Sequence, residues 1–282
     1  MSQQPPIVTL PLFSKLDERL LAFLRGLSAE EWEQQTLAPR WRVMDVALHL
    51  LDGNLRTLSM LRDGYFGVPP TGDLGSYQGL VGFLNQLNAD WITATRRLSP
   101  AVVMQLLEQS GQEYSAFLGT LDVWAPAAFS VGWAGESESL NWFHIAREYT
   151  EKWHHQQQIR QAVGRGEAEL LQPELYEPYL QTSMRALPHH YRNVAAPEGT
   201  QLRVVVESPE SSYQWWLRRG AEQWTLGNEA AGQAAASVYL DAHVAWRMLS
   251  KELDAQTAAK CVRAEGAAWL AEPVLSLTAV MA

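Results

Sequence analysis

The sequence has very little cysteine: Cys261 is the single one among 282 residues. One cysteine can form no disulfide bond within the chain and no cluster of cysteines around a metal ion. Any metal would therefore have to be held by histidine and carboxylate side chains. Cys261 stands in the segment AAKCVRAEG, which we predict to be a strand, so we expect it to be a small core residue.

The chain is also poor in basic residues. It has 22 lysines and arginines against 31 aspartates and glutamates, a formal net charge of -9 and a pI near 5.3. Nucleic acids and anionic membranes attract basic patches, so neither is expected as a partner. Long apolar runs are missing as well, since no stretch reaches the ~18 residues that a membrane span needs. Because the first residues have no basic segment before an apolar run, we expect a cytoplasmic protein.

What the sequence does have is helical periodicity over its first half. Apolar residues recur at spacings of three and four over residues 13–27 and 43–62, a pattern typical of amphipathic helices. Two further helical runs join at a Ser-Pro step, and another helix is predicted over residues 141–163. Ser137 or Ser139 is expected to cap the start of that last helix.

The pattern changes in the second half. A helical stretch interrupted by Pro173 and Pro178 comes first, and short β-rich segments separated by turns follow. A length of 282 residues suits two ordinary domains. We therefore predict an α domain over residues 1–166 and an α+β domain over residues 167–282.

The helix predicted over residues 141–163, NWFHIAREYTEKWHHQQQIRQAV, has two stripes. At ~100° per residue, aromatic side chains lie on one face and a polar stripe lies on the other, made of His144, Glu148, Glu151, His155 and Gln158. One interpretation is a solvated polar face. The other is a polar face turned inward, where Glu151 and His155, four residues apart, bind one cation together. The second interpretation requires a third ligand from elsewhere in the chain.

His49 is the candidate for that third ligand. It lies at the edge of the apolar face of the helix predicted over residues 43–62, and Gly53 leaves room one turn further on. A lone histidine in such a place is usually a structural residue held by a hydrogen bond. His154 points ~100° away from His155, so we expect it to be a surface or packing histidine.

Two motifs carry a resemblance to a known family. WRVMDVALHL looks like a Trp-x-Val-x-Asp-x-x-x-His entry to a second helix, with Trp41, Asp45 and His49 in place. EKWHHQQQIRQAVG is similar to a fourth-helix Glu-x-x-x-His motif with an Ala/Gly ending. On these motifs the first half resembles the DinB/YfiT-like superfamily, and within it the N-terminal domain of mycothiol-dependent maleylpyruvate isomerases. The resemblance implies a four-helix bundle in which His49, Glu151 and His155 bind a divalent metal.

Gln158 departs from the isomerase pattern, because isomerase-like members often have an aspartate at that position. Glutamine is closer to the His-Arg-Gly-Gln form of DinB-type members. In the second half, VRAEG before a last helix resembles the sterol-carrier-like domain that follows the bundle in those isomerases.

A site of two histidines and one glutamate leaves coordination positions open, as catalytic zinc sites do. A zinc or nickel ion there can activate a bound water or a thiol near neutral pH. The resemblance implies a mycothiol or bacillithiol-type thiol as cofactor and a small electrophile as substrate, for a thiol transferase or maleylpyruvate isomerase-like enzyme. Two alternatives stay open: a metal-water hydrolase with Glu148 as base, and a non-enzymatic small-ligand-binding protein with a vestigial metal site. A homodimer is a further expectation, because bundles of this kind with exposed aromatic stripes often dimerise.

Overall fold

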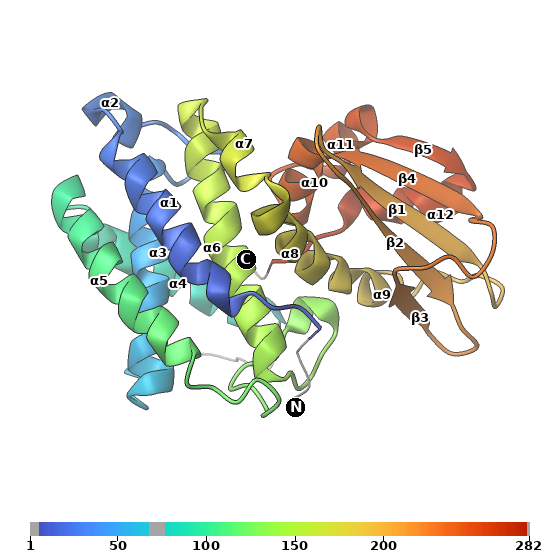
Figure 1. Ribbon diagram of the computed structural model, residues 1–282, viewed down its shortest axis with the longest axis horizontal. Coiled ribbons are helices and arrows are strands. Elements are labelled where there is room, and N and C mark those ends of the chain that lie inside the picture. The colour runs from blue at the N-terminus through green and yellow to red at the C-terminus, as the bar shows by residue number, and fades with distance from the viewer. Residues whose placement is uncertain (1–5, 68–76, 281–282) are drawn as a thin grey trace. The chain divides into compact units, whose positions relative to one another are not determined.

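The computed structural model describes residues 6–67 and 77–280, and the chain divides into two compact units (Figure 1). The first unit contains the described residues up to Ala128 together with Leu140–Glu167, and the second contains Phe129–Ser139 and Ala168–Val280. A helical region is followed by a five-stranded mixed sheet with further helices. This succession confirms the predicted α plus α+β fold class. The domain limits at residues 166 and 167 stay a prediction.

The first unit is helical. Its elements are η1 (Leu10–Leu12), α1 (Phe13–Arg25), α2 (Ala29–Trp32), α3 (Val43–Thr57), the π-helical continuation η2 (Leu58–Arg62), α4 (Tyr77–Thr95), α5 (Pro100–Leu118) and α6 (Asn141–Val163). Each of α1, α3, α5 and α6 contacts two others of these four, and α4 packs against α3 (Figure 1). Within the described ranges, no helix is long and apolar enough to cross a membrane.

Local chemistry sets two of the helix starts in this unit. Ser28 begins α2 with a capping box, in which its hydroxyl accepts from the Glu31 backbone at 3.2 Å and the Glu31 carboxylate accepts from the Ser28 backbone at 2.7 Å. Ser99 begins α5, where its hydroxyl accepts from the backbone N–H of Val102 at 3.4 Å and Pro100 occupies the first turn. The Ser-Pro step therefore separates two helices, α4 and α5.

The cap predicted for α6 is wrong. Leu140 is the N-cap residue and makes no side-chain hydrogen bond to the first turn. Ser139 instead accepts a hydrogen bond from the backbone of Val131 at 2.8 Å. The first N–H groups of α6 donate to backbone carbonyls of the preceding segment, from Asn141 to Ala125 and from Trp142 to Val123, each at 2.9 Å. Since the backbone satisfies these donors, no capping side chain is needed.

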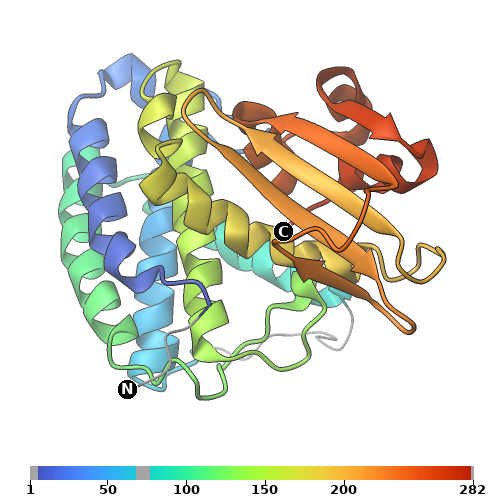
Figure 2. The same cartoon turned by 45° about the vertical axis from the view of Figure 1, so that its right-hand side comes forward.

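The second unit has a five-stranded sheet in the order β3-β2-β1-β4-β5 (Figure 2). Only β1 and β4 are parallel among these neighbours, and the other pairs are antiparallel. The strands are β1 (Gln201–Glu207), β2 (Ser212–Arg219), β3 (Trp224–Gly227), β4 (Ala236–Asp241) and β5 (Arg263–Gly266). The helical elements are η3 (Gly132–Ala134), α7 (Glu167–Leu170), which begins at the end of the first unit, α8 (Pro173–Ser183), η4 (Met184–Ala186), α9 (Leu187–His190), α10 (Ala242–Leu249), α11 (Ala255–Cys261), α12 (Ala268–Ala271) and η5 (Glu272–Ser276). Helix α10 packs on β1 and β4, and α12 packs on β4 and β5.

Two predictions for the second unit are wrong. Cys261 is the last residue of helix α11 and is exposed, so it is neither in a strand nor in the core. Asp254 starts that helix by accepting from the backbone of Thr257 at 2.9 Å, and β5 begins only afterwards. Pro178 lies inside α8, whereas Pro173 stands in its first turn. Of the two prolines, only Pro173 marks a helix boundary.

Candidate functional site

The polar stripe of α6 faces the interior. His144, His155 and Gln158 keep only 2%, 7% and 4% of their surface exposed, and the aromatic stripe opposite is buried as well. The interpretation of a solvated polar face is therefore wrong. Buried imidazole and amide groups are stable only when they are hydrogen-bonded or bind a ligand. Because the aromatic stripe is buried within the chain, it offers no surface for the expected homodimer, which stays a prediction.

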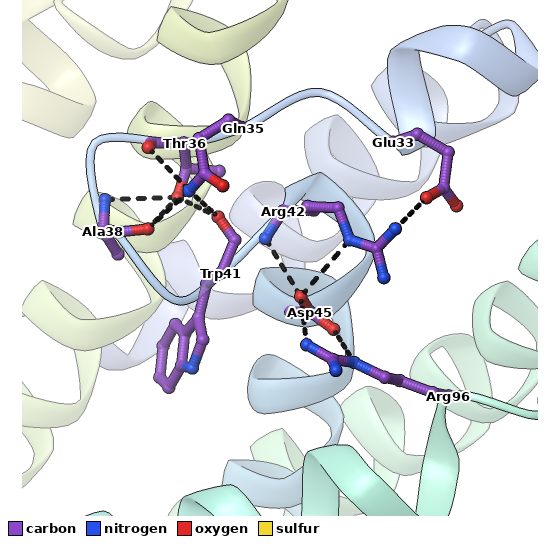
Figure 3. A network of polar contacts seen from close by, with 8 residues as sticks. All are labelled: Glu33, Gln35, Thr36, Ala38, Trp41, Arg42, Asp45 and Arg96. Carbon is purple, nitrogen blue, oxygen red and sulfur yellow. Dashed lines mark hydrogen bonds and ion pairs between the residues drawn. The ribbon is translucent and has the colours of Figure 1, made fainter.

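Asp45 ties the start of α3 to the end of α4. Its carboxylate accepts from Arg96 at 2.9 Å and 3.0 Å and from the backbone N–H of Arg42 at 3.0 Å (Figure 3). The Arg42 guanidinium also pairs with Glu33. Asp45 is completely buried, and charge-assisted bonds of this kind are strong there. The aspartate of the Trp-x-Val-x-Asp-x-x-x-His motif thus positions the helix that carries His49.

Trp41, just before α3, forms an aromatic wall beside two histidines. Its carbonyl accepts from the Thr36 hydroxyl at 2.7 Å and from the Gln35 side chain at 2.8 Å (Figure 3). The centroid of its indole lies 4.7 Å from that of the His49 ring and 6.0 Å from that of the His155 ring. The loop that holds the Trp41 carbonyl therefore also holds the ring against His49.

Two histidines and two glutamates line a small cavity, and a third histidine, His154, packs against one of the two. The ring centroids of His49 and His155 are 4.6 Å apart, and those of His154 and His155 are 3.9 Å apart. Nε2 of His155 lies 3.6 Å from a carboxylate oxygen of Glu151. The cavity has a volume of about 40 Å³ and is lined by His49, Glu151 and His155 with Leu50, Gly53, Asn54, Tyr114, Glu148 and Lys152. At roughly 10–15 Å³ for each water, it has room for a few waters or the end of a small ligand.

One group in the described part of the chain has ligand atoms that all lie within 4.8 Å of one another: Glu151, His154 and His155. The sequence predicted His49 in place of His154. His49 lines the same cavity and its ring contacts that of His155, but it lies outside this close group. His154 is buried, with 4% of its surface exposed, so it is a packing histidine that also stands at the site. The signal for it in the sequence was the adjacent pair His154-His155.

Hydrogen bonds orient two of the three rings. His155 donates from Nδ1 to the side-chain oxygen of Gln158 at 2.7 Å, and His154 donates from Nδ1 to the carbonyl of Thr150 at 2.9 Å. Both acceptors are oxygens that cannot donate, so each ring has its proton on Nδ1 and a lone pair on Nε2. Nδ1 of His49 is buried and has no hydrogen-bond partner among the described residues. Packing against Trp41 and His155 is what orients the His49 ring.

Burial keeps these imidazoles neutral. It lowers the pKa of His155 to about 3 and the pKa of His154 to about 4. Burial, together with the nearby His155 and Arg56, holds the pKa of His49 well below its usual range. Burial also raises the pKa of Glu151. A neutral imidazole with a lone pair is the form that binds a metal cation, so the electrostatics suit a metal site.

Glu148 has both carboxylate oxygens engaged. The Tyr114 hydroxyl donates to one oxygen at 2.8 Å, and the Arg147 guanidinium donates to the other at 2.5 Å. Burial pushes the pKa of Glu148 upward, but Arg147, His144 and the Tyr114 bond outweigh it, and the net shift is downward. A carboxylate held as an anion by two donors is a weak base. The geometry therefore does not favour Glu148 as the base that the hydrolase alternative requires.

Lys152 of α6 lines the cavity and contacts two further helices. Its ammonium lies 2.7 Å from a carboxylate oxygen of Asp17, and the two side chains are 9% and 16% exposed. The same ammonium lies 5.0 Å above the ring of Tyr114. The ion pair connects α6 to α1, and the contact with Tyr114 connects α6 to α5. Lys152 directly follows the proposed ligand Glu151 in the sequence.

Comparison with known proteins identifies the first half. The family model described as mycothiol maleylpyruvate isomerase N-terminal domain matches residues 13–160, which is more than half of the chain. The chain belongs to this family. The family resemblance inferred from the two motifs is thereby confirmed. No curated protein matches the chain.

Solved structures extend the family's fold to the second half. The mycothiol-dependent maleylpyruvate isomerase matches with a TM-score of 0.54, and a mutant of it with one histidine replaced by alanine matches with 0.51. Each match has 14% sequence identity and covers 91% of both chains, so it shows the fold alone. A protein described as UbiJ-SCP2 ubiquinone synthesis protein matches 39% of this chain and 82% of its own, at 24% identity. Its TM-score of 0.23 carries no argument, so the sterol-carrier-like character of the second half stays a prediction.

Proposed function

We propose that the protein is a thiol-dependent isomerase of the maleylpyruvate isomerase type, in which His49, Glu151 and His155 hold a divalent metal. The observation that carries the proposal is a pair of neutral imidazoles, His155 buried and His49 half-buried, beside a carboxylate at a small cavity. Membership of the isomerase family supports the reaction type and the low-molecular-weight thiol, with mycothiol as the first candidate and a bacillithiol-type thiol as the second.

The side chains fit a metal on three counts. His155 presents the Nε2 lone pair toward Glu151, and His49 has a buried Nδ1 without a partner among the described residues. The imidazoles are neutral, so no proton competes with the ion at neutral pH. Two imidazoles and one carboxylate suit zinc or nickel. When bound, the ion would supply a Lewis acid that stabilises a thiolate near neutral pH.

The surrounding residues prepare the cavity for such chemistry. Leu50 gives it an apolar wall, and Trp41 packs against the rings of His49 and His155. Apolar surroundings exclude water and strengthen charge interactions inside. Addition of a thiol to one carbon of a conjugated cis double bond turns it into a single bond. After rotation, loss of the thiol re-forms the double bond in the trans geometry, and the thiol is regenerated without net oxidation. Tyr114 and Lys152, which line the cavity, can orient the polar end of a substrate during these steps.

The test is turnover of maleylpyruvate followed by proton NMR, with and without mycothiol, on zinc-loaded protein and on protein treated with a chelator. We expect turnover only when the thiol and the metal are both present, and its loss in His155→Ala. The matched control is Cys261→Ser, which removes the exposed thiol of α11 and should leave turnover unchanged. Turnover without added thiol, or none with both present, would contradict the proposal.

A further inference from the structure

We propose that Gln158 is the positioning residue that fixes the tautomer of His155 and, as a neutral acceptor, limits how tightly the site holds its metal. The effect on metal affinity rests on the proposed function. The effect on the tautomer of His155 concerns the metal-free protein alone.

The contact between the two side chains is short and shielded. Nδ1 of His155 lies 2.7 Å from Oε1 of Gln158, three residues further along α6. Both residues are buried, with 7% and 4% of their surface exposed, so water does not compete for the bond. An amide oxygen only accepts, and the proton of the neutral ring must therefore be on Nδ1.

The aromatic neighbours of His155 cannot make this choice, and the Glu151 carboxylate lies 3.6 Å from Nε2, beyond hydrogen-bond distance. The rings of Trp41, His49 and His154 contact it at centroid distances of 6.0, 4.6 and 3.9 Å. Ring packing restricts the plane of the imidazole but does not distinguish its nitrogen atoms from its carbon atoms. Gln158 makes that distinction and thereby directs Nε2 toward Glu151, 3.6 Å away.

Gln158 is also neutral, which matters for the strength of the site. A carboxylate in the same place would attract the Nδ1 proton more strongly and make Nε2 a better donor to a metal. An amide orients the His155 ring in the same way but raises the basicity of Nε2 less. The chain is therefore expected to hold its metal less tightly than a variant with a carboxylate at this position, and more tightly than one with no acceptor. Changes to such supporting groups typically alter metal affinity about 10–100-fold.

Three variants separate these effects: Gln158→Leu, which removes the acceptor, Gln158→Glu, which replaces it by a carboxylate, and Gln157→Leu as matched control. Gln157 is completely buried on the same helix, and its amide donates to the carbonyl of Glu167 at 3.2 Å, away from His155. The first readout is the long-range proton–nitrogen NMR spectrum of the imidazoles in metal-free protein, assigned with His155→Ala. The second is the zinc dissociation constant from competition with a chromophoric chelator.

We expect the Nδ1–H form of His155 in the wild type, in Gln158→Glu and in Gln157→Leu, and its loss in Gln158→Leu. Zinc should bind about 10–100-fold more weakly to Gln158→Leu and more tightly to Gln158→Glu. An unchanged tautomer and affinity in Gln158→Leu would overturn the inference. If Gln158→Leu does not fold, an affinity of Gln158→Glu no higher than that of the wild type overturns it. A wild type that binds no zinc but shows the expected tautomers refutes the proposed function and leaves the positioning role standing.

Discussion

Buried neutral histidines make the stability of the protein depend on pH. Burial lowers the pKa of His144 and His154 to about 4 and that of His155 to about 3, whereas the usual value is 6.5. Below pH 6.5 the unfolded chain takes up protons that the folded chain does not bind. The stability is therefore complete above pH 6.5 and is lost as the pH falls toward 4, by about 1.4 kcal/mol per pH unit for each histidine.

Urea unfolding of the metal-free protein at pH 7.5, 6.0 and 5.0 measures this dependence. We expect the free energy of unfolding to fall steeply between pH 6.0 and 5.0. In His144→Gln the slope should be smaller by about 1.4 kcal/mol per pH unit, because one titrating group is gone. Equal stability at pH 7.5 and 5.0 would show that these imidazoles are protonated in the folded protein.

The sequence predicted some of the residues that line the cavity and missed others, among them Tyr114 and Lys152. Spacing on one helix placed Glu151 and His155 together, and the motif after Trp41 pointed to His49. The structure brings these three residues to one cavity. His154 was expected to be a surface or packing histidine, because spacing gives only the angle between neighbours on a helix. Which faces of a helix are buried depends on the surrounding helices, and α6 is buried nearly all round.

At the scale of elements, the ion pair between Lys152 and Asp17 is expected to be important for the packing of α1 against α6. Both side chains are mostly buried, at 9% and 16% exposure, and lie 2.7 Å apart. Lys152→Met would leave the Asp17 carboxylate without its partner cation, which should lower the free energy of unfolding by about 3–5 kcal/mol. Chemical denaturation of Lys152→Met, Asp17→Leu and the double variant measures the coupling.

The double variant is the informative one. Replacing both charges by apolar groups removes the unpaired charge, so we expect it to be more stable than Lys152→Met alone. Single variants that lose less than about 1 kcal/mol would mean that the pair behaves like an exposed salt bridge.

Element boundaries were predictable where a side chain sets them and not where the backbone does. The Ser-Pro step in the sequence marks the start of α5, which Ser99 caps. Helix α6 instead begins with N–H groups that donate to the carbonyls of Val123 and Ala125, a long-range contact that no local pattern encodes. Cys261 was misplaced for a related reason, since the short helix α11 depends on its Asp254 cap and the strand starts just after it.

For the whole molecule, the fold class followed from the change in pattern between the two halves, since helical and alternating periodicities are distinct. A bound metal cannot be predicted from periodicity alone, because it needs three side chains from two helices of the first unit to meet. Two ligand sets share Glu151 and His155 and differ in the third residue, His49 or His154. His154 and His155 both donate from Nδ1 and keep a lone pair on Nε2, so this hydrogen bond does not separate the two sets. We favour His49 because it lines the cavity with Glu151 and His155, whereas His154 does not, and because its buried Nδ1 has no partner in the described ranges.

Metal content per chain tests the central claim most directly. Wild type, His49→Ala, His154→Ala and His155→Ala would be incubated with zinc, desalted identically and analysed by plasma mass spectrometry, with circular dichroism to verify folding. We predict about one equivalent in the wild type and in His154→Ala, and loss of the ion from folded His49→Ala and His155→Ala. No metal in the wild type, or an ion lost from His154→Ala and kept by His49→Ala, would contradict the account.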